Sequence, residues 1–160
     1  MKNFFFIIVL MLCFSCKKKE ENVFRVFIDI KVLEDDNFQV FYIDDLESGY
    51  SEKNRKTIQV KGISEFQTIV FELPNNVLPK MFRIDLGENK KESPIEIKSV
   101  KLKHNDKVIE INDLVLDRFF KPNIYIEKVD KAFLRQSIES RYDPFLSSTP
   151  LLNKKMELEF

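Results

Sequence analysis

The alternation of apolar and polar side chains is the feature that most constrains how this chain folds. Along VFRVFIDIKV, residues 23–32, every second side chain from Val26 to Val32 is apolar, and the intervening Asp29 and Lys31 are charged. A period of two residues places one set of side chains on each face of an extended strand, whereas a helix requires a period of about 3.6. The segment therefore predicts a half-buried β-strand whose apolar face lies on a core.

The same pattern recurs along the rest of the chain at intervals of about 8–15 residues, and it predicts about eight to ten strands. AFLRQSIES, residues 132–140, is a weak helix candidate. Short strands separated by polar turns indicate an all-β fold, an antiparallel β-sandwich of jelly-roll type, formed by residues 23–160 as a single domain. The further segments that carry the alternation are FQVFYI (38–43), TIQV (57–60), FQTIVFEL (66–73), MFRIDL (81–86), IEIKSVKLK (95–103), KVIEI (107–111), NIYIEKV (123–129) and KMELEF (155–160).

Two local irregularities refine this expectation. EDDN, residues 34–37, turns the chain after the first strand and predicts an antiparallel hairpin between the first two strands. Farther on, the apolar positions change parity between Ile97 and Val100. Such a slip needs one extra residue in the strand, so we expect a β-bulge near Lys98 and Ser99.

The chain changes abruptly from apolar to charged residues at Cys16. A short positive segment, MKN, precedes the apolar run FFFIIVLMLCF (4–14), and Ser15, Cys16 and the charged KKKEE follow. The run is shorter than the roughly 20 residues that a membrane-spanning helix needs. The pattern therefore predicts a signal peptide.

This segment resembles a bacterial lipoprotein signal, in which a small residue precedes the cysteine that is acylated. SCKKKEE is similar to the relaxed form found in lipoproteins of the Bacteroidota, although Phe14 is bulkier than usual and Cys13 replaces the usual leucine. The resemblance implies a removed signal peptide (1–15) and a lipidated cysteine with a charged tether (16–22). A thiolate is nucleophilic enough to take the diacylglyceryl group, so Cys16 is the expected lipid attachment site.

The expected location is the bacterial cell envelope, at the outer membrane, with the domain facing the periplasm or the cell surface. The lipid anchor, which carries palmitate-like acyl chains, would make the membrane a partner of this protein. An uncleaved N-terminal anchor and a plain secretory signal are the alternatives.

Charge and cysteine content argue against a nucleic-acid-binding protein and against a disulfide-stabilised domain. The 26 basic and 26 acidic side chains balance, and loss of Lys2 with the signal leaves a net charge of −1. A nucleic-acid partner would require a basic excess, so none is expected. Both cysteines, Cys13 and Cys16, lie in the signal region, so the exported domain forms no disulfide. Its stability must come from an apolar core, which the 16 phenylalanines allow.

The residues of the mature chain do not predict an enzyme. The single histidine, His104, begins the tight turn HND, where we expect it to be solvated. One histidine and no cysteine beyond the lipidated one leave no zinc site of nitrogen and sulfur ligands. Adjacent acids suit glycoside hydrolysis only if two carboxylates flank a cleft. Here they sit at turns, where acids are ordinary. No cofactor is expected, and a structural calcium ion stays open as an alternative. The acid pairs are Asp35-Asp36, Asp44-Asp45 and Asp113 with Asp117.

A longer segment carries a second resemblance. ISEFQTIVFELPNNVLPKMFRIDLGENKKESPIEIKSVKL (63–102) is similar to bacterial β-sandwich domains of the carbohydrate-binding, galactose-binding-like kind. Those domains often carry a strand of the form xRIDxG, a short excursion, and a strand of the form I-x-I-x-S-I-x-L. The earlier NFQVFYIDD (37–45) resembles their x-Q-x-F-Y strand, and the likeness covers about residues 24–125. It implies a non-catalytic, carbohydrate-binding-like module.

Candidate ligand-binding residues follow from strand geometry. Arg83 and Asp85 are two positions apart, so they project from the face opposite Phe82. A guanidinium beside a carboxylate can grip sugar hydroxyls, and the ring of Tyr42 or Tyr50 could stack on a sugar. The alternative is a surface ion pair of about 0–1 kcal/mol. The chain has no tryptophan for sugar stacking. The second functional hypothesis is therefore a structural or assembly subunit that binds another envelope protein.

Overall fold

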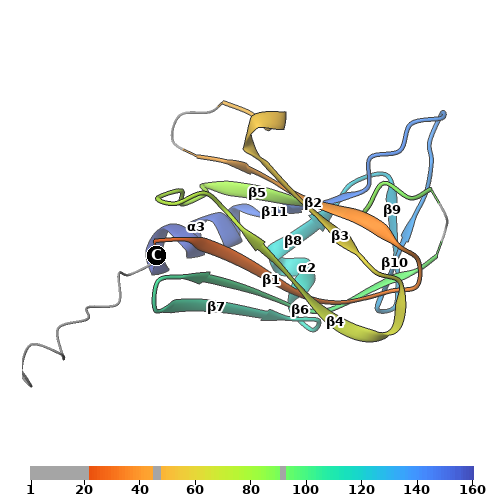
Figure 1. Ribbon diagram of the computed structural model, residues 1–160, viewed down its shortest axis with the longest axis horizontal. Coiled ribbons are helices and arrows are strands. Elements are labelled where there is room, and N and C mark those ends of the chain that lie inside the picture. The colour runs from red at the N-terminus through yellow and green to blue at the C-terminus, as the bar shows by residue number, and fades with distance from the viewer. Residues whose placement is uncertain (1–21, 45–47, 91–92) are drawn as a thin grey trace, which may run out of the picture.

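The alternation in the first segment gives the strand β1 (Phe24–Val32), in which every second side chain from Phe24 onward is buried. A computed structural model describes residues 22–44, 48–90 and 93–160 of the chain. The signal peptide, Cys16 and most of the charged tether lie outside the described residues. Within them the prediction of an all-β sandwich is confirmed, because two antiparallel sheets pack face to face (Figure 1).

The described residues form eleven strands in two sheets. The six-stranded sheet has the order β4 (Ile63–Glu72), β1, β6 (Ile95–His104), β10 (Ala132–Arg135) and β9 (Ile126–Val129), with β7 (Lys107–Asn112) also paired to β6. The five-stranded sheet has the order β3 (Arg55–Val60), β2 (Asp36–Ile43), β5 (Met81–Asp85), β11 (Phe145–Ser148) and β8 (Phe120–Pro122).

Strand pairing is nested around the turn between β3 and β4. β1 pairs with β6 in one sheet, and β2 pairs with β5 in the other. The expected hairpin between the first two strands is wrong, because β1 and β2 belong to different sheets. The EDDN turn instead carries the chain from one layer to the other. Nested antiparallel pairs of this kind are compatible with a jelly roll, and that finer assignment stays a prediction.

The predicted bulge in β6 is confirmed. Asp29 of β1 lies opposite Ser99, but the next residue, Ile30, lies opposite Ile97. The register therefore skips Lys98, which is the extra residue. Because of this extra residue, the apolar side chains before and after the bulge point into the core, and both Ile97 and Val100 are buried.

The last segment is a helix and not a strand. All of KMELEF except Phe160 lies within α3 (Pro150–Glu159), which begins at the N-cap Thr149 with Pro150 in its first turn. Leu152 and Met156 are buried at a spacing of four residues, whereas Leu158 is 73% exposed. The alternation was therefore coincidental, and the core contacts follow the helical period.

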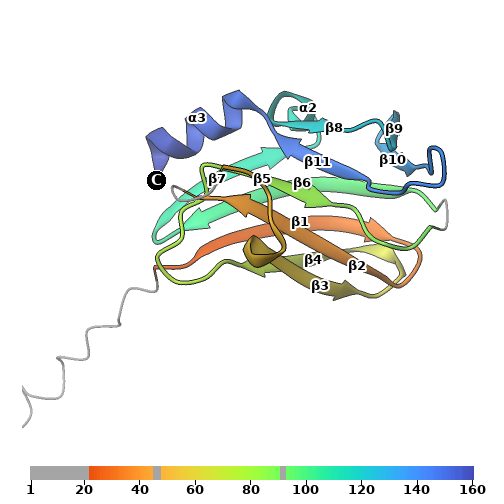
Figure 2. The ribbon, with the colours of Figure 1, turned by 90° about the horizontal axis from the view of Figure 1, so that it is seen from above.

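The weak helix candidate is also wrong, because Ala132–Arg135 forms β10 and its neighbours are turns. Two other helices are short, η1 (Glu52–Asn54) and α2 (Leu116–Phe119). Figure 2 shows α2 and α3 on one side of the sandwich and β3 and β4 on the opposite side. The helices thus close one open edge between the sheets.

His104 is buried, so the expectation that it is solvated is wrong. Only 8% of the residue is exposed, and its ring lies 6.0 Å from Phe160 and 6.3 Å from Phe24, measured between ring centroids. Burial lowers the pKa of His104, and Lys107 lowers it further. Phe160, the C-cap of α3, packs against the His104 ring, and the sequence pattern does not predict this helix.

Buried polar groups join the two sheets at one end. Arg135 of β10 donates from Nη1 to Asp36 Oδ2 of β2 at 2.5 Å and to the carbonyl of Leu86 at 2.7 Å. Asp36 Oδ1 accepts the backbone N–H groups of Glu88 and Asn89 at 2.7 and 2.9 Å. The loop after β5 is therefore held against both sheets by one carboxylate.

Gly87 provides a test of this arrangement. Its φ is +94°, and a Cβ there would overlap the Asp36 carboxylate. We expect Gly87→Ala to lower the free energy of unfolding by about 3 kcal/mol, because strain and displacement of a buried ion pair add together. The control Gly49→Ala, where an added Cβ meets no described atom within 4 Å, should cost under about 0.5 kcal/mol. Urea unfolding measures both, and equal stabilities would contradict the prediction.

Candidate functional site

A groove on the outer face of the five-stranded sheet contains both polar residues proposed from the MFRID strand. Its volume is about 270 Å³, near the lower limit of small-molecule pockets. It takes a small unit, such as the end of a longer ligand. We call it the Arg83 groove, and its lining residues are Asn37, Gln39, Phe41, Glu52, Arg83, Asp85, Gly87, Glu88, Lys90, Tyr142, Asp143 and Pro144.

Strand register places Arg83 among aromatic rings. Phe41 of β2 is the direct cross-strand partner of Arg83, and Phe145 of β11 lies opposite Asp85 on the other side of β5. The guanidinium carbon is 4.5 Å from the centroid of the Phe41 ring and 4.4 Å from that of Phe145. The ring of Tyr50 is 5.6 Å away. These cation–π contacts hold the guanidinium in a fixed position at the groove floor.

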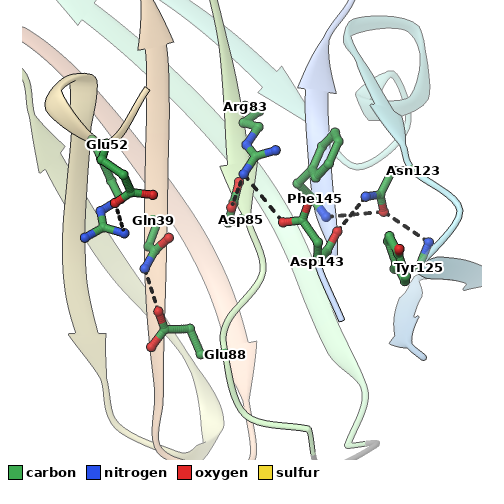
Figure 3. A network of polar contacts seen from close by, with 10 residues as sticks. Gln39, Glu52, Arg83, Asp85, Glu88, Asn123, Tyr125, Asp143 and Phe145 are labelled. Carbon is green, nitrogen blue, oxygen red and sulfur yellow. Dashed lines mark hydrogen bonds and ion pairs between the residues drawn. The ribbon is translucent and has the colours of Figure 1, made fainter. Parts of the chain in front are cut away.

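Two carboxylates flank the same guanidinium (Figure 3). Arg83 Nη2 donates to Asp85 Oδ2 at 2.9 Å and to Asp143 Oδ1 at 3.5 Å. The side chains of Arg83 and Asp85 are only 16% and 12% exposed, so this is not the exposed surface pair considered as the alternative. Partial burial makes each hydrogen bond here stronger than its counterpart in water.

Asp85 is electrostatically unusual. Burial raises the pKa of its carboxyl to about 7; Arg83 opposes this increase, and Asp143 adds to it. Among the described residues, neither Asp85 Oδ1 nor Arg83 Nε has a hydrogen-bond partner. Both atoms are buried, and an unpaired buried polar atom carries a desolvation cost of about 1–3 kcal/mol. Arg83 and Asp85 line the groove, and each has one unpaired polar atom buried beneath the groove surface.

Asn123 positions the wall that carries Asp143 and Phe145. Its Nδ2 donates to the carbonyl of Asp143 at 2.6 Å, and its Oδ1 accepts the backbone N–H groups of Tyr125 and Phe145 at 3.2 and 3.4 Å. One side chain thus ties the segment before β11 to the segment before β9, as Figure 3 shows.

The opposite wall is formed by Gln39 and Glu88. Gln39 Nε2 donates to Glu88 Oε1 at 2.8 Å, and Asn37 Nδ2 donates to the other oxygen of Glu88 at 3.0 Å. The backbone of Glu88 is held by the buried Asp36 carboxylate. The buried ion pair between the sheets therefore also fixes this wall of the groove.

The structure separates the two candidate tyrosines. Tyr50 lies beside Arg83 and is 37% exposed, but it is not one of the residues that line the groove. Tyr42 lies on the other face of β2, opposite Phe82, and is 3% exposed within the core. It does not line the groove, and Phe41 is the aromatic residue of β2 that does. Since β2 is buried on both faces, its apolar pattern does not show which face belongs to the core.

The acid pairs singled out from the sequence are used in other ways. Asp35 accepts from Lys61 at 2.5 Å, Asp113 from Lys131 at 2.7 Å, and Asp117 from Lys128 at 2.5 Å. Within residues 22–44, 48–90 and 93–160, no group of three or more histidine, cysteine or carboxylate side chains could hold a metal ion. Asp45 is outside the described residues.

Comparisons with known proteins identify no related protein. No family model matches the chain, and no curated protein and no solved structure matches it. In the part of the chain that the structure describes, no helix is both long enough and apolar enough to cross a membrane.

Asp85 makes stability depend on pH. The ordinary pKa of an aspartate is 3.8, and the folded value is about 7. Between these values the folded state binds more protons than the unfolded state, so the free energy of unfolding falls as pH rises. We expect a loss on the order of 2–4 kcal/mol from about pH 4 to pH 7.5.

Urea unfolding across this pH range measures the loss. Asp85→Asn cannot ionise and should remove most of it. Glu96→Gln is the matched control, because Glu96 accepts from Lys31 at 2.6 Å on the other sheet. It should keep the wild-type dependence, and an unchanged loss in Asp85→Asn would show that another group is responsible.

Proposed function

We propose that this protein is a lipid-anchored cell-envelope protein whose β-sandwich binds a neutral saccharide in the Arg83 groove without catalysing its conversion. The observation that carries the proposal is the polar lining of the groove, in which the Arg83 guanidinium lies between the carboxylates of Asp85 and Asp143. A hydroxyl group donates one hydrogen bond and accepts others, so sugar hydroxyls can bind to carboxylates and to a guanidinium in the same groove.

The charge of the groove favours a neutral ligand. Four acidic side chains line it, and the basic residues that line it are Arg83 and Lys90. An anionic ligand would be repelled by the excess of carboxylates, whereas hydroxyl groups can donate to them. The ring of Tyr50 lies beside Arg83, outside the groove lining, and it offers an apolar surface to the ring of a saccharide that extends beyond the groove. The carboxylates present are Glu52, Asp85, Glu88 and Asp143.

The non-catalytic part of the proposal is supported by how these groups are restrained. Arg83 is held by two rings and two carboxylates, and Glu88 by two amides. His104 lies beside the end of α3, outside the groove. Such an arrangement supports selective binding better than proton transfer to a ligand.

Saccharide binding can be tested on groove variants. A glycan array with the purified protein identifies a ligand, and calorimetry at pH 8, where Asp85 is ionised, gives its affinity. We expect Asp85→Asn and Tyr50→Ala each to weaken binding about 5- to 30-fold, because each loses one charge-assisted hydrogen bond or one ring contact. Glu96→Gln should bind as the wild type does.

Arg83→Ala is a less specific test, since Arg83 also packs between two rings, and its removal disturbs the sheet surface. Wild-type affinity in both Asp85→Asn and Tyr50→Ala would show that the saccharide binds elsewhere on the protein. No binding at millimolar concentrations of any sugar would leave the assembly-subunit hypothesis ahead.

The anchor has its own test. If Cys16 is acylated, Cys16→Ser should block signal cleavage and leave the N-terminal peptide without the mass of the acyl chains, because the thiol that takes the diacylglyceryl group is lost. Cys13→Ser should be processed and partitioned normally. Phase separation with Triton X-114 and the mass of the N-terminal peptide give the readout, and normal processing of Cys16→Ser would refute lipidation.

A further inference from the structure

A second, larger groove lies between α3 and the loop before β5. Its volume is about 790 Å³, and its lining is mostly apolar. Leu78 and Met81 are each 37% exposed, which is high for large apolar side chains in a folded domain. We call it the apolar groove, and its lining residues are Leu78, Pro79, Lys80, Met81, Pro150, Asn153, Lys154, Met156 and Glu157.

The first described residue of the chain is fixed beside this groove. The carbonyl of Asn22 accepts the backbone N–H of Asn76 at 2.9 Å, and Asn22 Nδ2 donates to Asn76 Oδ1 at 2.8 Å. Asn76 is two residues before Leu78 in the same loop. Figure 1 shows the start of β1 and the C-terminus at the same end of the sandwich. The exit point of the tether is therefore adjacent to the apolar groove.

The length of the tether limits how far this end can lie from the anchor. Five residues lie between Cys16 and Asn22, and the six residue-to-residue steps of a fully extended chain span at most about 20 Å. An acylated Cys16 lies at the membrane surface. This length keeps Asn22 within about 20 Å of the lipid headgroups, and the loop that contains Asn76 and Leu78 lies beside Asn22.

We propose that the apolar groove is a membrane-docking surface, whose occupant is the lipid bilayer, and that Leu78 and Met81 enter the boundary between headgroups and acyl chains. This inference rests on the proposed lipid anchor. The anchor alone is flexible, and exposed apolar side chains next to its exit point restrict the orientation of the domain.

The docked orientation also places the saccharide site. β5 begins at Met81, which lines the apolar groove, and ends at Asp85, which lines the Arg83 groove. The Arg83 groove therefore lies farther along the same strand, at positions two and four residues beyond Met81. With the apolar groove on the bilayer, the loops that carry Glu88 and Tyr142 point away from it, and the Arg83 groove stays accessible to glycans.

The absence of tryptophan in this chain gives a clean experiment. Leu78→Trp introduces a single fluorescent reporter into the apolar groove, and Leu33→Trp introduces one at the other end of β1. Leu33 is 45% exposed, so the control reporter is similarly accessible. Met81→Trp is a second reporter if Leu78→Trp does not fold. The full-length lipidated variants are reconstituted into phosphatidylethanolamine–phosphatidylglycerol vesicles with and without brominated acyl chains.

We expect the Leu78→Trp emission to shift to shorter wavelength in vesicles. Brominated lipids should quench it at least about twofold more than the Leu33→Trp emission, because a docked side chain lies near the acyl chains. Equal quenching of the two reporters in protein that floats with the vesicles overturns the docking proposal and leaves the anchor intact. Protein that does not float contradicts the anchor and the orientation together. A Leu78→Trp emission already shifted in detergent, with a dimer by light scattering, would assign the groove to a second copy of the chain.

Discussion

A buried ion pair between Arg135 and Asp36 joins the two sheets, and several other parts of the structure depend on it. The two side chains are 0% and 2% exposed, and they come from β10 of one sheet and β2 of the other. Removing one partner of such a pair commonly costs about 3–5 kcal/mol, since it leaves an uncompensated charge in the core. The same Asp36 carboxylate holds the backbone of Glu88 and Asn89. The position of the loop after β5, and with it one wall of the Arg83 groove, follows from this contact.

The chemistry of the groove results from strand register. Arg83 contacts the ring of Phe41 because β2 and β5 pair with these residues opposite each other, and it contacts Phe145 because β11 adds on the other side of β5. A shift of either pairing by one residue would turn these rings toward the opposite face of the sheet. Burial raises the pKa of Asp85 to about 7, against the opposing effect of Arg83 and with a further increase from Asp143. The polar site thus depends on aromatic packing around it.

The sandwich has two ends with different surfaces, and this difference organises the proposed function. Asn22, the loop of Leu78 and the last helix lie at the end where the described part of the chain begins. The loops with Glu88 and Asp143 lie toward the other end, where β5 finishes. An anchored binding protein needs this polarity, because a ligand site at the anchored end would face the bilayer.

Period-two alternation was enough to predict the β class, the burial pattern of β1 and the bulge at Lys98. These features depend on local side-chain direction and on the fixed geometry of the strand. The pairing of Arg83 with Asp85 was also predictable, since two positions on one strand share a face. The abrupt change at Cys16 carried the lipoprotein hypothesis without any information on the fold.

Other features were decided only by tertiary contacts. The sequence could not show that β1 and β2 belong to different sheets, because a turn has the same composition whether it joins neighbours or crosses between layers. It could not show that Phe41, and not Tyr42, lines the groove, because both faces of β2 are buried. The last segment followed the helical period because Leu152 and Met156 find a core there, and a short alternation alone does not distinguish the two periods. The spacing of apolar side chains determined the fold class of this protein, while long-range packing determined which side chains meet in its grooves.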